Sequence, residues 1–183
     1  MTIENLIRAM PPPLVPFGTF KGPWRPVEEE IGTFLPQDYK DYVRIYGRGY
    51  LFQFLGICVP RSLNPNIRLE RNVRLVSAGF VGFEDLPYPI WPSQGGLLSF
   101  GGTDNGDELY WLTEGAPESW RVVVWDGDPD TSEVFDCDMT DFLAGLATGE
   151  ILPMQFPDVL LPCDRLFKPH SAERDVRDED LSD

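Results

Sequence analysis

The sequence predicts an α+β domain in which helices pack against a mostly antiparallel sheet of about five or six strands. Helical periodicity appears in three separated segments, and four short strand-like segments follow one another between the second and the third. Of the 183 residues, 42% are hydrophobic. This is enough apolar side chain to bury a core without disulfide or metal cross-links.

Residues 1–23 are predicted to form a short helix followed by a proline-rich arm. The helix would lie within residues 3–10 and end at Pro11, because proline lacks the amide donor and restricts the residue before it. The arm is interpreted as a strap over the domain, and a polyproline ligand is the weaker alternative. The side chains expected to hold the strap are Leu14, Phe17, Phe20 and Trp24.

A central domain is predicted over residues 24–168, and its clearest helix spans residues 36–46. Pro36 suits the first helical turn, and Gly47 suits the residue after the last one. The apolar stripe of this helix consists of Tyr39, Tyr42, Val43 and Tyr46. Residues 50–59 are then aromatic and apolar, which is typical of a strand or a buried segment.

A second helix is predicted over residues 66–79 and a third over residues 140–148, because apolar side chains recur there at helical spacing. Asp138 or Thr140 would cap the third helix, and Gly149 would end it. Three helices are therefore expected in the central domain.

Four consecutive strands are predicted between the second and third helices. The first three are residues 97–101, 108–113 and 120–126, and a short fourth lies near residues 133–137. Asn105-Gly106 joins the first two, and this dipeptide tolerates the positive φ angles of tight hairpin turns. The pattern therefore predicts an antiparallel meander.

Negative charge is concentrated in residues 101–141. The chain has a formal net charge of -15, and this segment holds twelve acidic residues against Arg121 alone. Such a charge repels nucleic acids and anionic lipids and attracts basic proteins. We therefore expect a basic protein as partner, with no direct binding to nucleic acid or membrane. The twelve are Asp104, Asp107, Glu108, Glu114, Glu118, Asp126, Asp128, Asp130, Glu133, Asp136, Asp138 and Asp141.

The candidate partner-binding residues combine acidic side chains with tryptophans. Trp111, Trp120 and Trp125 lie on the predicted strands, where most of them are expected to be buried. Any tryptophan exposed beside the acidic residues would be an interface anchor. The acidic candidates are Asp104, Asp107, Glu108, Glu118, Asp126, Asp128 and Asp130.

A calcium loop is one alternative for the alternating aspartates at 126, 128 and 130. Their spacing fits the start of such a loop, but Thr131 and Cys137 stand where a glycine and a glutamate are required. A turn between strands is therefore favoured, and no metal or other cofactor is expected.

Catalysis is disfavoured. His170, the only histidine, stands at the edge of residues 169–183, which are predicted to be a solvated acidic tail, and a catalytic group must be held in position. Carboxylate pairs such as Asp107 and Glu108 leave a hydrolase as a low-ranked alternative, because pairs are inevitable among so many acidic residues.

A cytoplasmic location is expected. The first residues lack a basic leader, and no apolar run approaches the roughly 20 residues of a membrane helix. The cysteines lack CxxC spacing and are expected to be buried, reduced thiols rather than disulfides or zinc ligands. They are Cys58, Cys137 and Cys163.

Four segments, taken in order, carry a resemblance to a known family. They are WRPVEEEIGTFLPQDYKDYVRIYGRGYL, WPSQGGLLSFGGTDNGDELYWLT, PESWRVVVWDGD and MTDFLAGLATGEI. The ordered set resembles the SUKH superfamily, specifically its branch related to the yeast cell-wall-synthesis regulator, over approximately residues 24–167. The family's signature positions correspond to Leu35, Pro36, Tyr39, Tyr46, Gly47, Gly49, Gly96, Gly101, Asp104, Gly106, Asp107 and Trp111.

The resemblance implies an α+β fold and a role without catalysis. Many bacterial members are immunity proteins that neutralise toxin domains, often nucleases, and fungal members act as regulatory scaffolds. The signature positions suit turns, caps and core aromatics, so they identify the fold and not a partner. We therefore expect an immunity protein that binds a basic toxin domain through its acidic surface, with a regulatory scaffold as the alternative.

Overall fold

A sheet of seven strands runs through the described part of the chain, which is residues 3–80, 86–128, 130–157 and 166–171 of the computed structural model. The strands are β1 (Gly49–Leu51), β2 (Leu55–Ile57), β3 (Leu97–Thr103), β4 (Glu108–Leu112), β5 (Arg121–Trp125), β6 (Glu133–Phe135) and β7 (Phe167–Pro169). Their order is β6-β5-β4-β3-β2-β1-β7, and all neighbouring pairs are antiparallel. The predicted fold class and the meander over β3 to β6 are confirmed.

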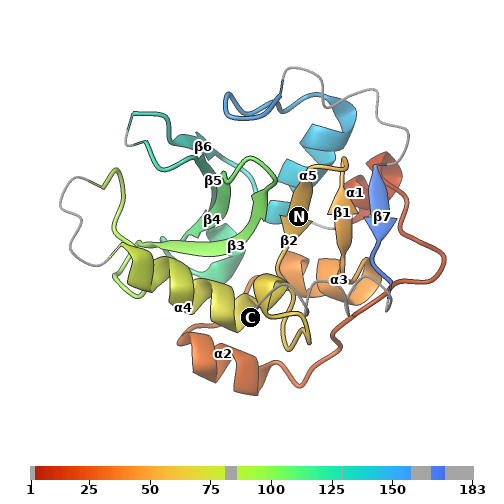
Figure 1. Cartoon of the computed structure of the whole chain (residues 1–183), viewed down its shortest axis with the longest axis horizontal. Helices are drawn as coiled ribbons and strands as arrows, with labels where there is room; N and C mark the ends of the chain where they lie inside the picture. Colours follow the sequence, from red (N-terminus) through yellow and green to blue (C-terminus); the bar gives the residue numbers. More distant parts are fainter. Residues whose placement is uncertain (1–2, 81–85, 129, 158–165, 172–183) are drawn as a thin grey trace.

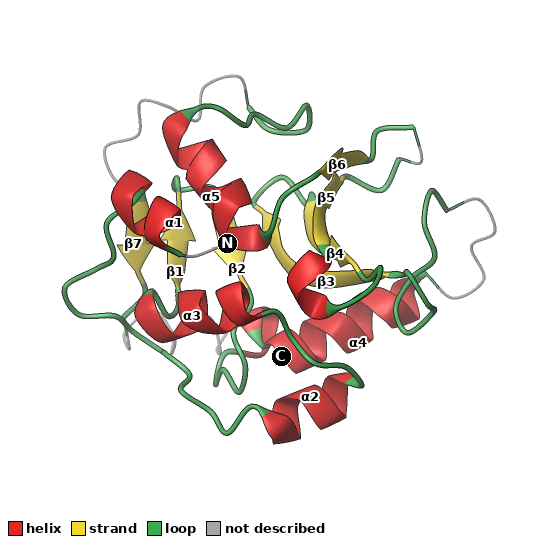
Figure 2. Ribbon diagram, turned by 180° about the vertical axis from the view of Figure 1, so that it is seen from behind, coloured by secondary structure: helices red, strands yellow, loops and turns green. Residues whose placement is uncertain are grey.

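Helices cover both faces of the sheet. They are α1 (Glu4–Ala9), α2 (Arg25–Ile31), α3 (Gln37–Ile45), α4 (Leu69–Gly79) and α5 (Met139–Thr148), with single 3-10 turns η1 (Pro65–Ile67) and η2 (Pro117–Ser119). Figure 1 shows α4 in front of β3, whereas the view from behind in Figure 2 shows α1, α3 and α5 in front of the strands. The sheet is therefore the middle layer of three.

Among the residues that the structure describes, this layering produces two hydrophobic cores. On β4, Leu109 and Trp111 join the larger core with α1, α3 and α5, whereas Tyr110 and Leu112 join a smaller one beside α4. Successive side chains of a strand point to opposite faces. The central strands are therefore apolar almost without interruption, as expected for strands buried on both sides.

Two short elements were not predicted. Helix α2 has three glutamates in seven residues, and it forms because Pro26 stands in its first turn and Gly32 takes a left-handed conformation after its end. Strand β7 has three residues and pairs with β1 at the sheet edge, where Pro169 is tolerated. With β1 and β2 as separate strands, the sheet has seven strands rather than about five or six.

The N-terminal segment forms part of the core. Leu6 and Met10 of the α1 region are fully buried, and α1 lies against α5. The expected strap is correct in part, because Trp24 packs edge-on against Tyr39. Leu14, however, is fully exposed, so it does not hold the arm to the domain.

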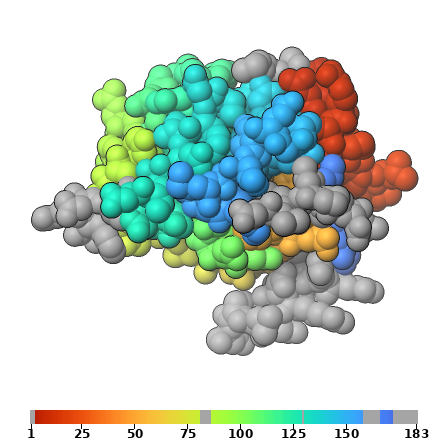
Figure 3. All heavy atoms as spheres, turned by 90° about the horizontal axis from the view of Figure 1, so that it is seen from above, coloured from red at the N-terminus to blue at the C-terminus, as the bar shows by residue number. Residues whose placement is uncertain are grey.

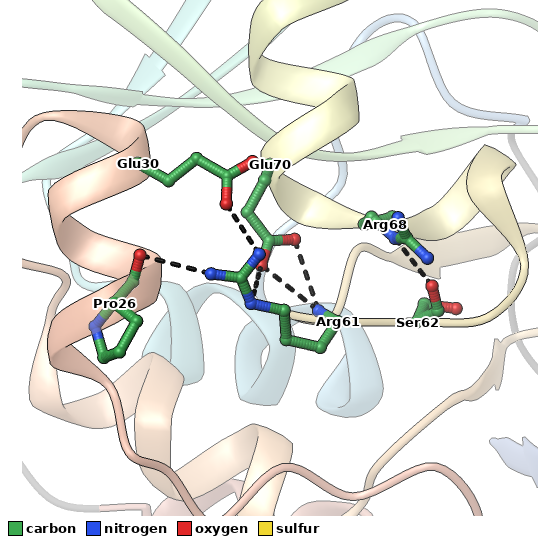
Figure 4. Close-up of polar contacts among 6 residues, drawn as sticks. All are labelled: Pro26, Glu30, Arg61, Ser62, Arg68 and Glu70. Atoms are coloured by element: carbon green, nitrogen blue, oxygen red, sulfur yellow. Dashed lines mark hydrogen bonds and ion pairs between the residues drawn. The ribbon is translucent and has the colours of Figure 1, made fainter.

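Arg61 connects α2 to α4 (Figure 4). Its guanidinium forms ion pairs with Glu30 on α2 (2.6 Å) and Glu70 on α4 (3.2 Å), and it also donates a hydrogen bond to the carbonyl oxygen of Pro26 (3.2 Å). The backbone N–H of Arg61 donates to the same Glu70 carboxylate. The Arg61 side chain therefore links α2 and α4, two helices that contact each other.

Among the described residues, no helix is both long enough and apolar enough to cross a lipid bilayer. Cys163 and most of the expected acidic tail lie outside the described residues.

Candidate functional site: the acidic end of the sheet and an adjacent trough

Strand register brings two acidic turns to the same end of the sheet. Glu108, the first residue of β4, pairs with Gly102 on one side and with Trp125, the last residue of β5, on the other. The turn from β3 to β4 and the turn from β5 to β6 therefore leave the sheet side by side. Exposed carboxylates at this end, which we call the acidic end, are Asp104, Asp126, Asp128 and Asp130.

Not all the predicted acidic candidates contribute to this surface. Asp107 is buried in the turn from β3 to β4, where its carboxylate accepts a hydrogen bond from Thr103 Oγ1 (2.6 Å) and its backbone N–H donates to the same hydroxyl (3.1 Å). Glu118 lies with Glu114 between β4 and β5, at the opposite end of the sheet. The prediction of one acidic surface over residues 101–141 is therefore wrong for these residues.

The turn after β5 is fixed by its own aspartates. Asp126 Oδ1 accepts hydrogen bonds from the Asp128 N–H (3.0 Å) and from the Thr131 hydroxyl. Asp128 Oδ1 in turn accepts from the Asp130 N–H (3.0 Å). The Thr131 bond, followed by the Asp128 bond, lowers the pKa of Asp126. Such Asx turns hold the carboxylates in a defined arrangement at the surface.

Residues 150–157 lie beside this turn, as seen from above in Figure 3. The Met154 N–H donates a hydrogen bond to Glu133 Oε2 (3.0 Å), and the Gln155 amide donates to the carbonyl oxygen of Thr131. In the described part of the chain, no group of three histidine, cysteine or acidic residues is arranged to hold a metal ion.

The three candidate tryptophans are core residues. Trp111, Trp120 and Trp125 have relative exposures of 1%, 4% and 2%. Trp111 packs against Tyr39 and Phe100 in the larger core, and Trp125 stacks on Phe80 in the smaller one. Because an interface anchor must reach the partner, none of these three buried tryptophans is a partner-binding residue.

A polar trough lies beside the acidic end, on the face of the sheet that carries α4. One row of paired residues crosses four strands there, in the order Tyr50, Gly56, Gly102 and Glu108. The two glycines have no side chain, so bare backbone forms the floor between Tyr50 and Glu108. The trough has a volume of about 210 Å³, and its walls include Asn66, Ile67, Asn72 and His170.

Glu108 forms one end of the trough. Its Oε2 accepts a hydrogen bond from Ser99 Oγ (2.7 Å), which itself accepts one from the Asn72 amide of α4 (2.8 Å). Its Oε1 has no hydrogen-bond or ion-pair partner among the described residues. Burial raises the pKa of Glu108, and the Ser99 hydrogen bond opposes this only in part.

Tyr50 and His170 form the other end. The Tyr50 hydroxyl donates to Asp104 Oδ1 (2.8 Å), which connects the trough to the acidic end. His170 stacks on Tyr50 with ring centroids 5.6 Å apart, and its backbone N–H donates to the carbonyl oxygen of Arg48 (3.0 Å). His170 is therefore buried against β1, and the prediction of a solvated tail over residues 169–183 is wrong for this residue.

Sequence reasoning missed the trough because its residues come from distant segments. A signal was present in the alternation of β2, where Gly56 stands between the buried Leu55 and Ile57. A glycine inside a strand often marks a bulge, a tight bend or a site where a ligand or another backbone approaches closely. The partner glycine, Gly102, could be identified only from the register.

Comparison with known proteins places the chain in a family. The family model SUKH_6, described as SMI1-KNR4 cell-wall, matches residues 22–143, which is more than half of the chain. The chain belongs to the SUKH superfamily. The matched part of this SUKH protein contains the acidic end and most of the trough, whereas His170 lies outside it. No curated protein and no solved structure gives a significant match.

Proposed function

We propose that this SUKH protein is a cytoplasmic immunity protein that binds and neutralises a basic toxin domain, such as a nuclease, without catalysis. The observation that carries the proposal is the acidic end of the sheet, where two neighbouring turns present four exposed carboxylates. Family membership supports a non-catalytic immunity or regulatory module. The acidic end supplies the surface that such a module needs.

Electrostatics explains how this surface would act. Clustered charges steer an oppositely charged protein during diffusion and raise its association rate, which suits an inhibitor that must act before damage occurs. The Asx hydrogen bonds of Asp126 and Asp128 hold the turn in place before the partner arrives. Little conformational entropy is then lost on binding, which favours affinity.

A regulatory scaffold is the second candidate. It is favoured by the description of the matching family model, which names a cell-wall protein group. Gene neighbourhood separates the two candidates, because an immunity gene is expected beside a toxin gene. A carboxylate-dependent hydrolase ranks below both, because family membership supports a non-catalytic module.

The test begins with affinity purification of the tagged full chain from its native host. The captured protein is then mixed with wild type and with D128N/D130N in stopped-flow experiments at low and physiological ionic strength. Asparagine keeps the turn's hydrogen-bond acceptors but removes two charges. The matched control, E114Q/E118Q, removes two exposed charges from the opposite end of the sheet.

We expect D128N/D130N to slow association by about 3-fold to 10-fold at low ionic strength, with a smaller effect at physiological salt. The control should associate at close to the wild-type rate. A captured toxin domain that loses activity on binding supports immunity. Equal association rates for both double variants, or a captured partner without net positive charge, would contradict the proposal.

A further inference from the structure

The floor of the trough has room for a bound group, because Gly56 carries no side chain where one would fit. A Cβ atom added at Gly56 would meet nothing within 4 Å, and Gly56 has no positive φ angle that would require glycine. The side chains on either side of the glycine pair in the row are Tyr50 and Glu108. At Gly56, the gap is therefore a consequence of residue choice and not of backbone geometry.

The charge of the trough is negative. Its lining includes the carboxyl groups of Asp104 and Glu108, and no lysine or arginine lines it among the residues that the structure describes. Lys168 is the next member of the row beyond Tyr50, but it is exposed and lies outside the lining. A carboxylate withdrawn from water without a cation is unfavourable, so a bound cation would stabilise Glu108.

The size of the trough limits its occupant. Its volume of about 210 Å³ corresponds to about seven water molecules and is below the range of about 300–1,000 Å³ that is typical of sites for drug-sized ligands. A single side chain or a fragment of similar size fits these dimensions. A nucleotide is disfavoured, because its phosphates would face two carboxyl groups.

We propose that the trough between Tyr50 and Glu108 binds one arginine side chain of the protein partner. The planar guanidinium lies flat over Gly56 and Gly102, donates to the unpartnered Oε1 of Glu108, and faces Asp104 at the rim. Guanidinium groups favour carboxylates and aromatic faces, and they are more weakly hydrated than ammonium groups. The assignment of the source to a partner rests on the proposed function, whereas the site itself does not.

A small probe tests the site directly. Nα-acetyl-arginine methylamide is titrated into the ¹⁵N-labelled full chain, and the amide signals of Gly56 and Gly102 are followed by NMR. Nα-acetyl-citrulline methylamide is the matched neutral probe, because it has a similar shape without the charge. We expect saturable shifts with the arginine probe at roughly millimolar concentration, and binding of the citrulline probe at least about 5-fold weaker.

Two variants remove the site in different ways. E108Q removes the charge but keeps an acceptor for Ser99, and G56V fills the trough with a β-branched residue that favours strands. Both should abolish the saturable shifts, whereas E118Q and G79A should retain them, because these residues lie away from the trough. No saturation in wild type, an equal response to both probes, or binding retained in E108Q and G56V would overturn the site.

The captured partner then identifies the source of the guanidinium. We expect the partner to dissociate about 10-fold faster from E108Q and G56V than from wild type, the loss expected for one charged hydrogen bond. If both variants bind the probe poorly but release the partner at the wild-type rate, the occupant is a free arginine-like molecule, and the assignment to the partner is wrong. If no basic partner is captured, the proposed function fails while the probe titration still decides the site.

Discussion

Asp38 and Asp138 cap the N-terminus of the same helix from two distant parts of the chain. Asp138 precedes α5 and accepts a hydrogen bond from the Asp141 N–H (2.8 Å), whereas Asp38 in the first turn of α3 accepts from the Thr140 N–H (3.0 Å). Burial, and then the negative charge of Asp138, raise the pKa of Asp38 to about 6 from its ordinary value of 3.8. The contact that joins α3 to α5 is therefore sensitive to pH.

The first prediction concerns D38N. The folded protein binds the Asp38 proton more tightly than the unfolded chain, so this group's contribution to stability is complete below about pH 4 and is lost as pH rises through about 6. Asparagine can still accept the Thr140 hydrogen bond and does not ionise. Relative to wild type, D38N should therefore gain on the order of 2 kcal/mol in unfolding free energy between pH 4 and pH 7.

Urea denaturation at both pH values measures this gain. D136N is the control, because Asp136 is exposed nearby and none of the described hydrogen bonds or ion pairs involves it. If the stability difference between wild type and D38N is the same at pH 4 and pH 7, the raised pKa of Asp38 is refuted.

The second prediction concerns the Arg61 connection. The Glu70 side chain has a relative exposure of only 1%, and R61Q would leave its carboxylate with the backbone N–H of residue 61 but without a cation among the described residues. Since an uncompensated buried charge is costly but Arg61 is itself partly exposed, we expect a loss of about 1–3 kcal/mol in unfolding free energy. Thermal and urea denaturation measure the change.

R25Q is the matched control for R61Q. Arg25 and Glu29 form an ion pair on α2 with side-chain exposures of 87% and 63%, and such a pair contributes about 0.5 kcal/mol or less. Equal losses of unfolding free energy in R61Q and R25Q would show that the burial of Glu70 does not strengthen its ion pair with Arg61.

The fold could be predicted from the sequence wherever a few neighbouring residues specify an element. The Asn105-Gly106 turn and the stripe of tyrosines on α3 specify their elements within a few residues, and the structure places both as expected. His170 could not be placed this way, because its position depends on Arg48, which is 122 residues away. Grouping acidic residues by their position in the sequence placed Glu118 wrongly, because each strand carries the chain from one end of the sheet to the other.

The third prediction concerns the close approach of the N-terminal arm to the end of α3. Gly47 has a φ of 65°, and a Cβ atom there would collide with the backbone carbonyl of Phe17, which also accepts a hydrogen bond from the Arg48 N–H (2.7 Å). G47A must therefore strain the backbone or displace the arm. We expect it to lose about 1–3 kcal/mol in unfolding free energy.

G79A tests the same substitution where the structure leaves room. Gly79 ends α4 without a positive φ, and a Cβ atom there meets nothing within 4 Å, so alanine should be neutral or stabilise by up to about 1 kcal/mol. Urea denaturation of both variants at one pH gives the comparison.

Because the Phe17 carbonyl belongs to the arm, proteolysis between residues 11 and 23 should also be faster in G47A than in wild type or G79A. Wild-type stability and cleavage rate in G47A would show that the arm does not depend on this contact.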